Sequence, residues 1–462
     1  MTLRGSHPIG ITLLLSLVGS GAAQAQANVE ALEELGKRVF FENISVPARQ
    51  SCSSCHAPDN GWTGNVAAFN LMQVAIPGAD PHTMGGRKPP SVAYASFSPD
   101  FGNNPLRSNA CLASTALSSP LDCKGGVFWD GRAKGTQIGT EVFAGAAAAL
   151  QAAYMDFLGP VADQALGPFP NDVEQNVDDG DDGGLPGAQA VCHAVESARY
   201  AELFSMAWNT PIACDPENVA LSFKRIAVAI SAWEHSAEVN SFSSKRDMAL
   251  AADSDHMSPH PGLTDEENLG HDLFFGIQSA LNPQKRNARC SACHNSEGAG
   301  STGDEVHQLY TDHVYRNIGL PPNPEIANFD PAMPDEQLFR TTQVVIHRGA
   351  AKTPNLRNVD KRRGAGFPKA YMHNGFFKSL QDVVHFYNTA SALDVCPINV
   401  TTAADARKHN CWPAAEFPAG AARGGAVVGN LGLTNVEEAA LVAYLKTLSD
   451  TQTIAAPTPY IP

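Results

Sequence analysis

The chain has 462 residues, of which 43% are hydrophobic, and a formal net charge of -15. This length exceeds that of most single domains, so we expect two or more. The acidic balance argues against nucleic acid and against anionic membrane surfaces as partners, because both repel a negatively charged protein.

The first 27 residues have the pattern of a secretory signal. Arg4 provides a short basic segment, an apolar run covers residues 9–18, and small residues precede Asn28. The run is too short to span a bilayer, and no later stretch has eighteen consecutive apolar residues. We therefore expect export to the bacterial periplasm, with no membrane span once the signal is removed.

The motif CxxCH occurs twice. Each copy supplies two thiols and one imidazole: Cys52, Cys55 and His56, and then Cys290, Cys293 and His294. Two thiols at this spacing can form thioethers with the vinyl groups of a haem, and the following imidazole can reach the iron. A redox CxxC pair or half of a zinc site is the alternative, but neither copy lies in a βαβ pattern or beside a second ligand pair. We predict two covalently bound haem c groups.

The other six cysteines fall into three pairs that are close in sequence. Each pair lies in a segment rich in Pro, Gly or Asn, and an oxidising compartment favours disulfides over free thiols. Many connectivities are possible, so local pairing is an expectation from proximity alone. The expected pairs are Cys111 with Cys123, Cys192 with Cys214, and Cys396 with Cys411.

Helices dominate the predicted secondary structure. Apolar residues recur at helical spacing in five segments, residues 29–41, 219–239, 264–275, 380–387 and 436–448. The third opens on a capping box that begins at Thr264. The rest is rich in Gly and Pro, which indicates long loops wrapped around cofactors. We predict a mainly α protein.

The two halves of the chain echo each other. LGKRVFF precedes the first CxxCH motif and LGHDLFF precedes the second, while KPPS and KTPN follow them. Internal duplication of one c-type cytochrome-like domain is the simplest explanation. We predict a signal peptide over residues 1–27, an N-terminal haem domain over 28–250 and a C-terminal haem domain over 251–462.

Taken together, these features resemble the bacterial dihaem cytochrome c peroxidase family, which includes the MauG-like enzymes. The resemblance covers nearly all of the mature chain. It is carried by LGKRVFFENIS, VFWDGRA, QALGPFPNDVE, KTPNLRNV and YMHNGFFKSLQDVVHFYN, in that order. It implies a peroxidatic haem in the N-terminal half, an electron-transfer haem in the C-terminal half and a tryptophan between them.

The resemblance assigns roles around the first haem. His56 is similar to the proximal iron ligand, Trp129 to the tryptophan that relays electrons, and Glu174 to the distal acid, with Gln164 as its neighbouring amide. A carboxylate there can move a proton from one peroxide oxygen to the other. The alternatives are an ordinary core tryptophan at 129 and a solvated loop glutamate at 174. His82 lies near a loop histidine that caps the resting iron in the family, and a plain loop histidine is the alternative.

The resemblance also concerns the second haem, whose proximal ligand is His294. In the usual peroxidases a methionine ligand occupies the position of Tyr387, whereas the MauG-like enzymes have a tyrosine there. A phenolate ligand favours oxidised iron. His385 competes for this role. It lies two residues before Tyr387 on the same predicted helix, so its side chain points to nearly the opposite face. Met372 is another competitor, and a simple core tyrosine at 387 is the remaining alternative.

Two positions depart from the family pattern. The resemblance implies a calcium ion between the haem domains with an asparagine ligand, and Lys88 occupies the matching position. In the MauG-like enzymes a surface tryptophan two positions before the second motif draws electrons from a protein substrate. The chain has Ala288 there.

These residues predict an oxidoreductase that reduces hydrogen peroxide to water. Electrons from a small redox protein, a cytochrome c or a cupredoxin, pass from the C-terminal to the N-terminal haem. The alternative is a MauG-like enzyme that oxidises residues of a partner protein through high-valent haem iron. A plain dihaem electron carrier is a third interpretation, which Gln164 and Glu174 disfavour because a carrier needs no acid-base groups above a haem.

Overall fold

The computed structural model describes residues 11–115, 117–177, 185–296, 303–327, 329–417 and 428–461. Within these ranges the protein is mostly helical, as predicted. The α-helices are α1 (Ile11–Phe41), α2 (Cys52–Cys55), α3 (Ala67–Leu71), α4 (Ala148–Tyr154), α5 (Pro160–Ala165), α6 (Ala188–Ser197), α7 (Glu202–Trp208), α8 (Val219–His235), α9 (Lys245–Ala252), α10 (Asp265–Phe275), α11 (Phe339–Thr342), α12 (Leu380–Thr389), α13 (Ala403–His409) and α15 (Asn435–Lys446).

Shorter elements connect the helices. The 3-10 turns are η1 (Pro58–Asn60), η2 (Ala95–Phe97), η3 (Pro120–Asp122), η4 (Thr140–Phe143), η5 (Met155–Phe157), η6 (Cys290–Ala292) and η7 (Val345–His347). Two antiparallel strand pairs complete the described structure, β1 (Gly102–Asn103) with β2 (Cys123–Lys124), and β3 (Tyr315–Arg316) with β4 (Ala351–Lys352).

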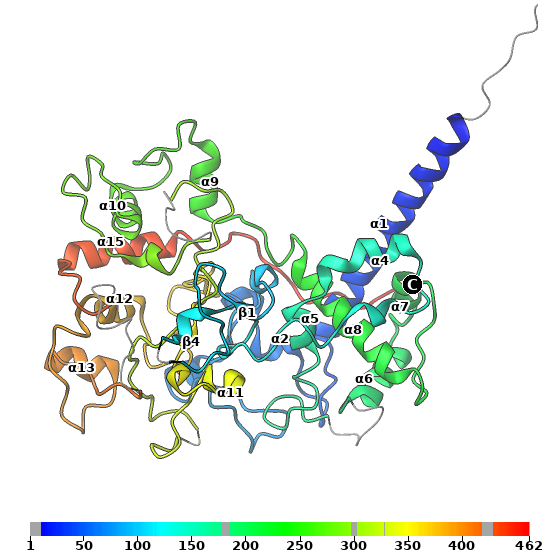
Figure 1. Ribbon diagram of the computed structural model, residues 1–462, viewed down its shortest axis with the longest axis horizontal. Helices are drawn as coiled ribbons and strands as arrows, with labels where there is room; N and C mark the ends of the chain where they lie inside the picture. The colour runs from blue at the N-terminus through cyan, green and yellow to red at the C-terminus, as the bar shows by residue number, and fades with distance from the viewer. Residues whose placement is uncertain are drawn as a thin grey trace, which may run out of the picture.

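The five predicted helices are all present, as α1, α8, α10, α12 and α15. The predicted capping box is confirmed, since the Thr264 hydroxyl accepts from the backbone N–H of Glu267 and the Glu267 carboxylate accepts from the N–H of Thr264. Helix α1 is longer than expected because it begins at Ile11, inside the predicted signal segment. Its first turns extend away from the rest of the protein (Figure 1).

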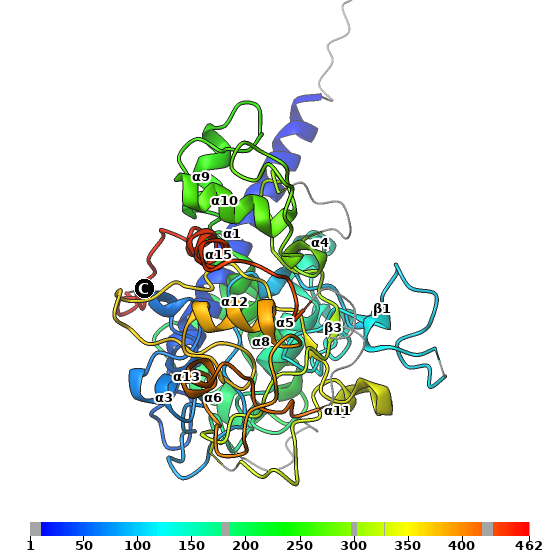
Figure 2. The same ribbon diagram turned by 90° about the vertical axis from the view of Figure 1, so that its left-hand side faces the viewer.

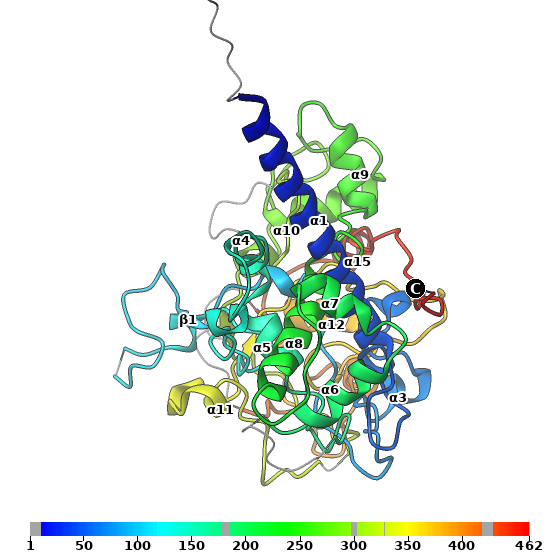
Figure 3. The same cartoon turned by 90° about the vertical axis from the view of Figure 1, so that its right-hand side faces the viewer.

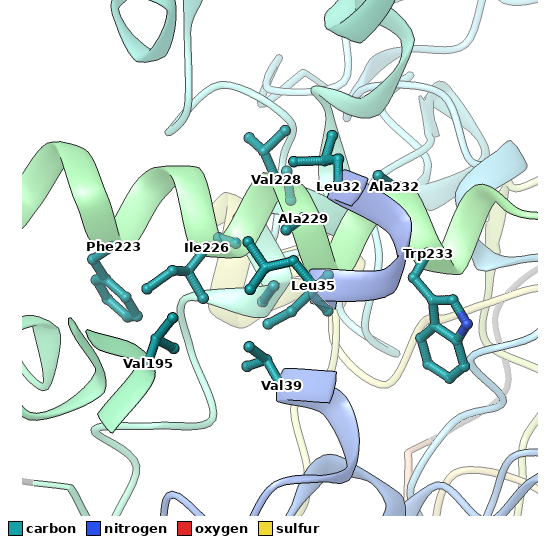
Figure 4. Packing of buried hydrophobic residues seen from close by; sticks show 14 of the residues in the cluster. Leu32, Leu35, Val39, Val195, Phe223, Ile226, Val228, Ala229, Ala232 and Trp233 are labelled. Atoms are coloured by element: carbon teal, nitrogen blue, oxygen red, sulfur yellow. The ribbon is translucent and has the colours of Figure 1, made fainter. Parts of the chain in front are cut away.

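The first apolar core forms where α1 crosses α8. Figure 4 shows Leu32, Leu35 and Val39 of α1 packed against Ile226 and Ala229 of α8. The crossing is close because Gly36 has no side chain, and a Cβ atom there would lie 1.9 Å from the carbonyl oxygen of Ala229. Figure 3 shows α1 descending past α7 and α8 to this crossing.

The second apolar core forms around α10, α12, α13 and α15. Figure 2 shows α10, α15, α12 and α13 one below another, on the opposite side of the protein from α1 and α8. A glycine again permits the main crossing, because a Cβ atom on Gly270 of α10 would lie 2.0 Å from the carbonyl oxygen of Ala440 in α15. The domain boundary predicted at residue 250 lies inside α9.

Several segments join the two halves. The N–H of Gly125 donates to the carbonyl of His313 at 3.0 Å, and the Arg87 guanidinium pairs with both Asp130 and Asp335 at 2.6 Å. The C-terminal segment also crosses from α15 back to the first half (Figure 1). There the Tyr460 hydroxyl donates to Glu202 at 2.7 Å, and the Arg38 guanidinium lies over the Tyr460 ring.

The disulfide pairing expected from proximity is confirmed. The three bonds join Cys111 to Cys123, Cys192 to Cys214, and Cys396 to Cys411. Among the helices described, none is both long enough and apolar enough to cross a membrane.

The close helix crossing in the first half gives a stability prediction. Gly36→Ala should lower the free energy of unfolding by about 1–3 kcal/mol, because the added methyl group collides with the backbone of α8. That loss outweighs the gain of about 1 kcal/mol in helix propensity. Thermal unfolding followed by circular dichroism measures the change. Gly364→Ala is the matched control, since nothing lies within 4 Å of its Cβ position. Equal melting temperatures for the two variants would contradict the prediction.

Candidate functional site

The first CxxCH motif lies shortly after α1. Its cysteines begin and end the single turn of α2, and His56 follows. The Nδ1 atom of His56 donates to the backbone carbonyl of Trp62 at 3.2 Å. This hydrogen bond fixes the tautomer in which Nε2 carries the lone pair that binds a metal. Burial lowers the pKa of His56 to about 4, so the imidazole is neutral and competent as a ligand.

The second motif repeats this arrangement. It contains the 3-10 turn η6, after which Nδ1 of His294 donates to the backbone carbonyl of Tyr310 at 2.8 Å. Burial again lowers the pKa of the imidazole. Both histidines are therefore oriented by a backbone acceptor and present Nε2 as a ligand.

The four motif cysteines are free thiols, whereas the other six form disulfides. Burial raises the pKa of Cys52, Cys55 and Cys290 to about 12. These thiols are therefore protonated at neutral pH. Two thiols followed by an oriented, neutral imidazole in each motif fit the attachment of haem.

One cavity brings the predicted catalytic residues to the first motif. It is lined from both halves of the chain, and its wall includes Cys52, Cys55, His56, Trp129, Gln164, Glu174, Lys88 and Lys352. Gln164 comes from α5 and Glu174 from the loop that follows it. We name this space the haem cavity. The three residues predicted to be catalytic, Trp129, Gln164 and Glu174, line this one cavity although they are far apart in the sequence.

Trp129 lies between the haem cavity and the second half of the chain. Its indole N–H donates to the carbonyl of Lys88 at 2.9 Å, and its own carbonyl accepts from the N–H of Lys352 at 2.9 Å. The indole ring lies 6.3 Å from the ring of His373, measured between centroids. Trp129 is 9% exposed, so it is a buried aromatic group that contacts both halves.

Glu174 lies where the haem cavity meets a second, more polar hollow. The two spaces share Gly85, Arg87, Arg132, Val173 and Glu174. Burial raises the pKa of Glu174, and this effect is opposed by the Arg132 guanidinium and by a hydrogen bond from Asn171. A carboxylate with a raised pKa is a stronger base. Because Glu174 lies between the two hollows, it can contact a small molecule that enters the haem cavity from the more polar hollow.

Tyr387 lies beside the second motif. It is on α12, and its hydroxyl is close enough to Cys293, Cys290 and Arg316 for their charges to shift its pKa. Burial raises the pKa of its hydroxyl. The Nδ1–H group of His385 instead donates to the Glu438 carboxylate of α15, at 3.0 Å. Of the two competing side chains on α12, Tyr387 is therefore the one near the attachment cysteines.

Three further predicted positions have different surroundings. His82 lies on an exposed turn, outside the lining of the haem cavity, so the structure does not bring it to the other site residues. Ala288 is buried in the second core. Lys88 is one of the residues that line the haem cavity. A cationic ammonium repels a metal ion instead of binding it, so this position does not fit a calcium ligand and we derive no step through calcium.

Comparison with known proteins finds relatives of one kind. The family model described as Di-haem cytochrome c peroxidase matches residues 30–255. The methylamine utilization protein MauG of Paracoccus denitrificans is 26% identical over 457 residues, which cover 95% of this chain and 94% of that protein. The cytochrome-c peroxidase IdrP2 of a Pseudomonas species is 24% identical over 433 residues, 86% of this chain and 87% of that protein.

The chain is similar to dihaem cytochrome c peroxidases over most of its length. The proteins of that family are oxidoreductases that act on peroxide, and the family implies two haem groups.

Solved structures agree with this fold. The diheme peroxidase BthA of Burkholderia thailandensis aligns with a TM-score of 0.62 and 25% identity, covering 91% of this chain and 86% of that one. A MauG-like protein associated with microbial copper homeostasis aligns with a TM-score of 0.57 and 23% identity, covering 93% and 92%.

Sequence reasoning missed three residues of the haem cavity. Arg132 faces Glu174 from the same turn as Trp129, and Lys352 reaches the cavity from β4. Glu234 of α8 is buried there, and burial raises its pKa to about 8, so it is protonated at neutral pH. The sequence carried a signal for Glu234, because it follows a run from Ile226 to Trp233 in which Ser231 is the only polar residue. It carried one for Lys352 as well, because this residue heads a repeated Lys-x-Pro segment.

The position of Tyr387 gives a spectroscopic prediction. Tyr387→Phe should change the electron paramagnetic resonance and optical spectrum of the C-terminal haem, because it removes the phenolic oxygen beside Cys293. The response of the N-terminal haem to peroxide should be unchanged. His385→Gln is the matched control, since its side chain bonds to Glu438. A spectrum altered by His385→Gln and unaffected by Tyr387→Phe would refute the assignment.

Proposed function

We propose that this protein is a periplasmic dihaem peroxidase that reduces hydrogen peroxide to water. Its peroxidatic haem is attached through Cys52 and Cys55 in the N-terminal domain, residues 28–250, and its electron-transfer haem lies in the C-terminal domain, residues 251–462. A small redox protein supplies the electrons. The observation that carries this proposal is that Trp129, Gln164 and Glu174 line one cavity with the first CxxCH motif.

The protein residues supply acid-base chemistry and orientation. Each bound haem contributes an iron ion that changes oxidation state, held by His56 in one half and His294 in the other. The Glu174 carboxylate accepts the proton of one peroxide oxygen and returns it to the other, so that the O–O bond breaks with water as the leaving group. Two electrons and two further protons complete the reduction to a second water. Gln164 offers an amide that can orient the peroxide by hydrogen bonding.

Trp129 provides the route for the electrons. It is buried, it lines the haem cavity, and its backbone is bonded to Lys352 in the second half of the chain. The hydrogen bond from the indole N–H to the carbonyl of Lys88 orients the ring, and the backbone bond from Lys352 anchors the segment that carries it. An aromatic side chain held in this way is suited to carry charge between the two haem sites.

The acid-base role of Glu174 gives the test of the proposal. Glu174→Gln should slow peroxide reduction by about 10²- to 10⁴-fold, because the amide cannot accept the proton. Stopped-flow absorbance of the N-terminal haem after mixing with peroxide measures the rate. Unchanged kinetics in this variant would remove Glu174 from the mechanism.

A second variant controls for loss of packing. Arg132 holds down the pKa of Glu174, so Arg132→Gln should raise that pKa further. Since the base must be ionised, activity is lost as pH falls through this pKa, and the acid limb of kcat/KM should move to higher pH. A purely structural role for either residue would lower the rate without moving the limb.

A MauG-like activity is the second candidate. Tyr387 favours it, because a tyrosine ligand beside the second motif stabilises oxidised iron. A methionine ligand would instead favour reduced iron, which stores an electron. In the MauG-like case oxidising equivalents from peroxide are passed to residues of a partner protein. Ala288 is buried and aliphatic. Electrons from such a partner would therefore not pass through position 288, where the MauG-like enzymes have a surface tryptophan.

The redox state needed for reaction separates the two candidates. We expect the fully oxidised protein to be inert toward peroxide until one haem has been reduced, as a peroxidase with an electron-storing haem requires. Optical spectra recorded after adding peroxide to oxidised and half-reduced protein test this. A prompt reaction of the fully oxidised form would favour the MauG-like candidate.

A further inference from the structure

Two lysines flank Trp129 in the wall of the haem cavity. The carbonyl of Lys88 accepts from the indole, and the N–H of Lys352 donates to the backbone carbonyl of the same tryptophan. Both lysine side chains line the cavity that also contains Cys52 and Cys55. Two lysines therefore border the space beside the first attachment site.

Neither ammonium group has a carboxylate partner among the described residues. Lys88 Nζ donates to the carbonyl of Pro89 at 3.2 Å, while Lys352 Nζ donates to Ser98 Oγ at 2.6 Å and to the carbonyl of Gly126. All three acceptors are uncharged. Because an ammonium group has three N–H donors, Lys88 retains two for a further partner and Lys352 retains one.

Unpaired cations at such sites are unfavourable. Burial lowers the pKa of Lys88 to about 8 and that of Lys352 to about 7. Arg87 in the same wall shows how the protein balances a cation elsewhere, by pairing with Asp130 and Asp335. Burying a charge is costly unless an opposite charge and hydrogen bonds compensate it. The cavity is therefore built to receive anionic groups at these two lysines.

The acidic side chains of the cavity do not supply these anions. Glu234 is protonated at neutral pH because burial raises its pKa to about 8. Glu174 interacts instead with Arg132 and Asn171. A haem, by contrast, carries two propionate carboxylates, which equals the number of unpaired ammonium groups.

We propose that Lys88 and Lys352 bind the propionate carboxylates of the haem attached to Cys52 and Cys55. This inference rests on the attachment set out in the proposed function. Each lysine forms a charge-assisted hydrogen bond to a carboxylate. The two lysines are thus cofactor-binding residues, and they neutralise the propionates beside the indole of Trp129.

This role has a consequence for the reduction potential of the N-terminal haem. A nearby positive charge favours the reduced iron, which carries one positive charge less than the oxidised iron. Lys352→Met or Lys88→Met leaves a propionate charge uncompensated, so the oxidised state gains stability. We expect the reduction equilibrium to change by about tenfold in each variant, which for one electron is a fall of about 59 mV.

Spectroelectrochemical titration of the complete, haem-loaded protein tests this inference. Mass spectrometry first establishes that both haems are attached, so that a failure of the proposed attachment is distinguished from a failure of the lysine assignment. The haems are told apart by their absorption bands. Lys352→Arg and Lys88→Arg retain the charge and should keep the potential near that of the wild type. Lys408→Met, which removes an exposed lysine paired with Asp405, is the control for net charge.

The outcomes are decisive in both directions. A lower potential of the N-terminal haem in both methionine variants, restored by arginine, supports the assignment. If both haems are present and the reduction potential of the N-terminal haem changes no more in the methionine variants than in Lys408→Met, the assignment is overturned. An equal fall in the methionine and arginine variants also overturns it, because that result reports altered packing and not lost charge.

Discussion

The hydrogen bond from each proximal histidine to a backbone carbonyl is the constraint on which the site depends. Trp62 and Tyr310 supply these carbonyls, and both have a left-handed backbone, with φ of 61° and 60°. Residues with side chains rarely adopt this conformation, so the surrounding structure must hold them in it. Both side chains are almost completely buried in aromatic clusters. Burial of an aromatic ring thus fixes a carbonyl, and the carbonyl fixes the imidazole.

The same physical solutions occur in both halves. Gly36 and Gly270 each allow one helix to touch the backbone of another. Lys88 and Lys352 each stand two residues before a proline whose carbonyl bonds to a proximal histidine. These parallels support the predicted duplication of one domain, which we retain as a proposal. The halves differ at the expected distal positions, where Glu174 lies in one and Tyr387 in the other. Under the proposed function, that difference separates acid-base chemistry in the first half from the storage or transfer of charge in the second.

Sequence patterns predicted the parts of the structure that local physics determines. Helices with an apolar stripe or a capping box, such as α8 and α10, were found within a few residues of their ends, and disulfides between neighbours followed from proximity. Short helices such as α5 and α7 were missed because tertiary packing, and not a long periodic pattern, stabilises them. The motifs of the family located Trp129 and Glu174, but no local pattern shows that Lys352 reaches the same cavity from the other half.

The return of the C-terminal segment ties the first domain to the end of the chain. Ile454 and Tyr460 pack on the first core, and the Tyr460 hydroxyl bonds to Glu202. A segment that follows α15 therefore completes the surface of the N-terminal half. Expression of the N-terminal half alone would leave this part of its apolar core exposed to solvent.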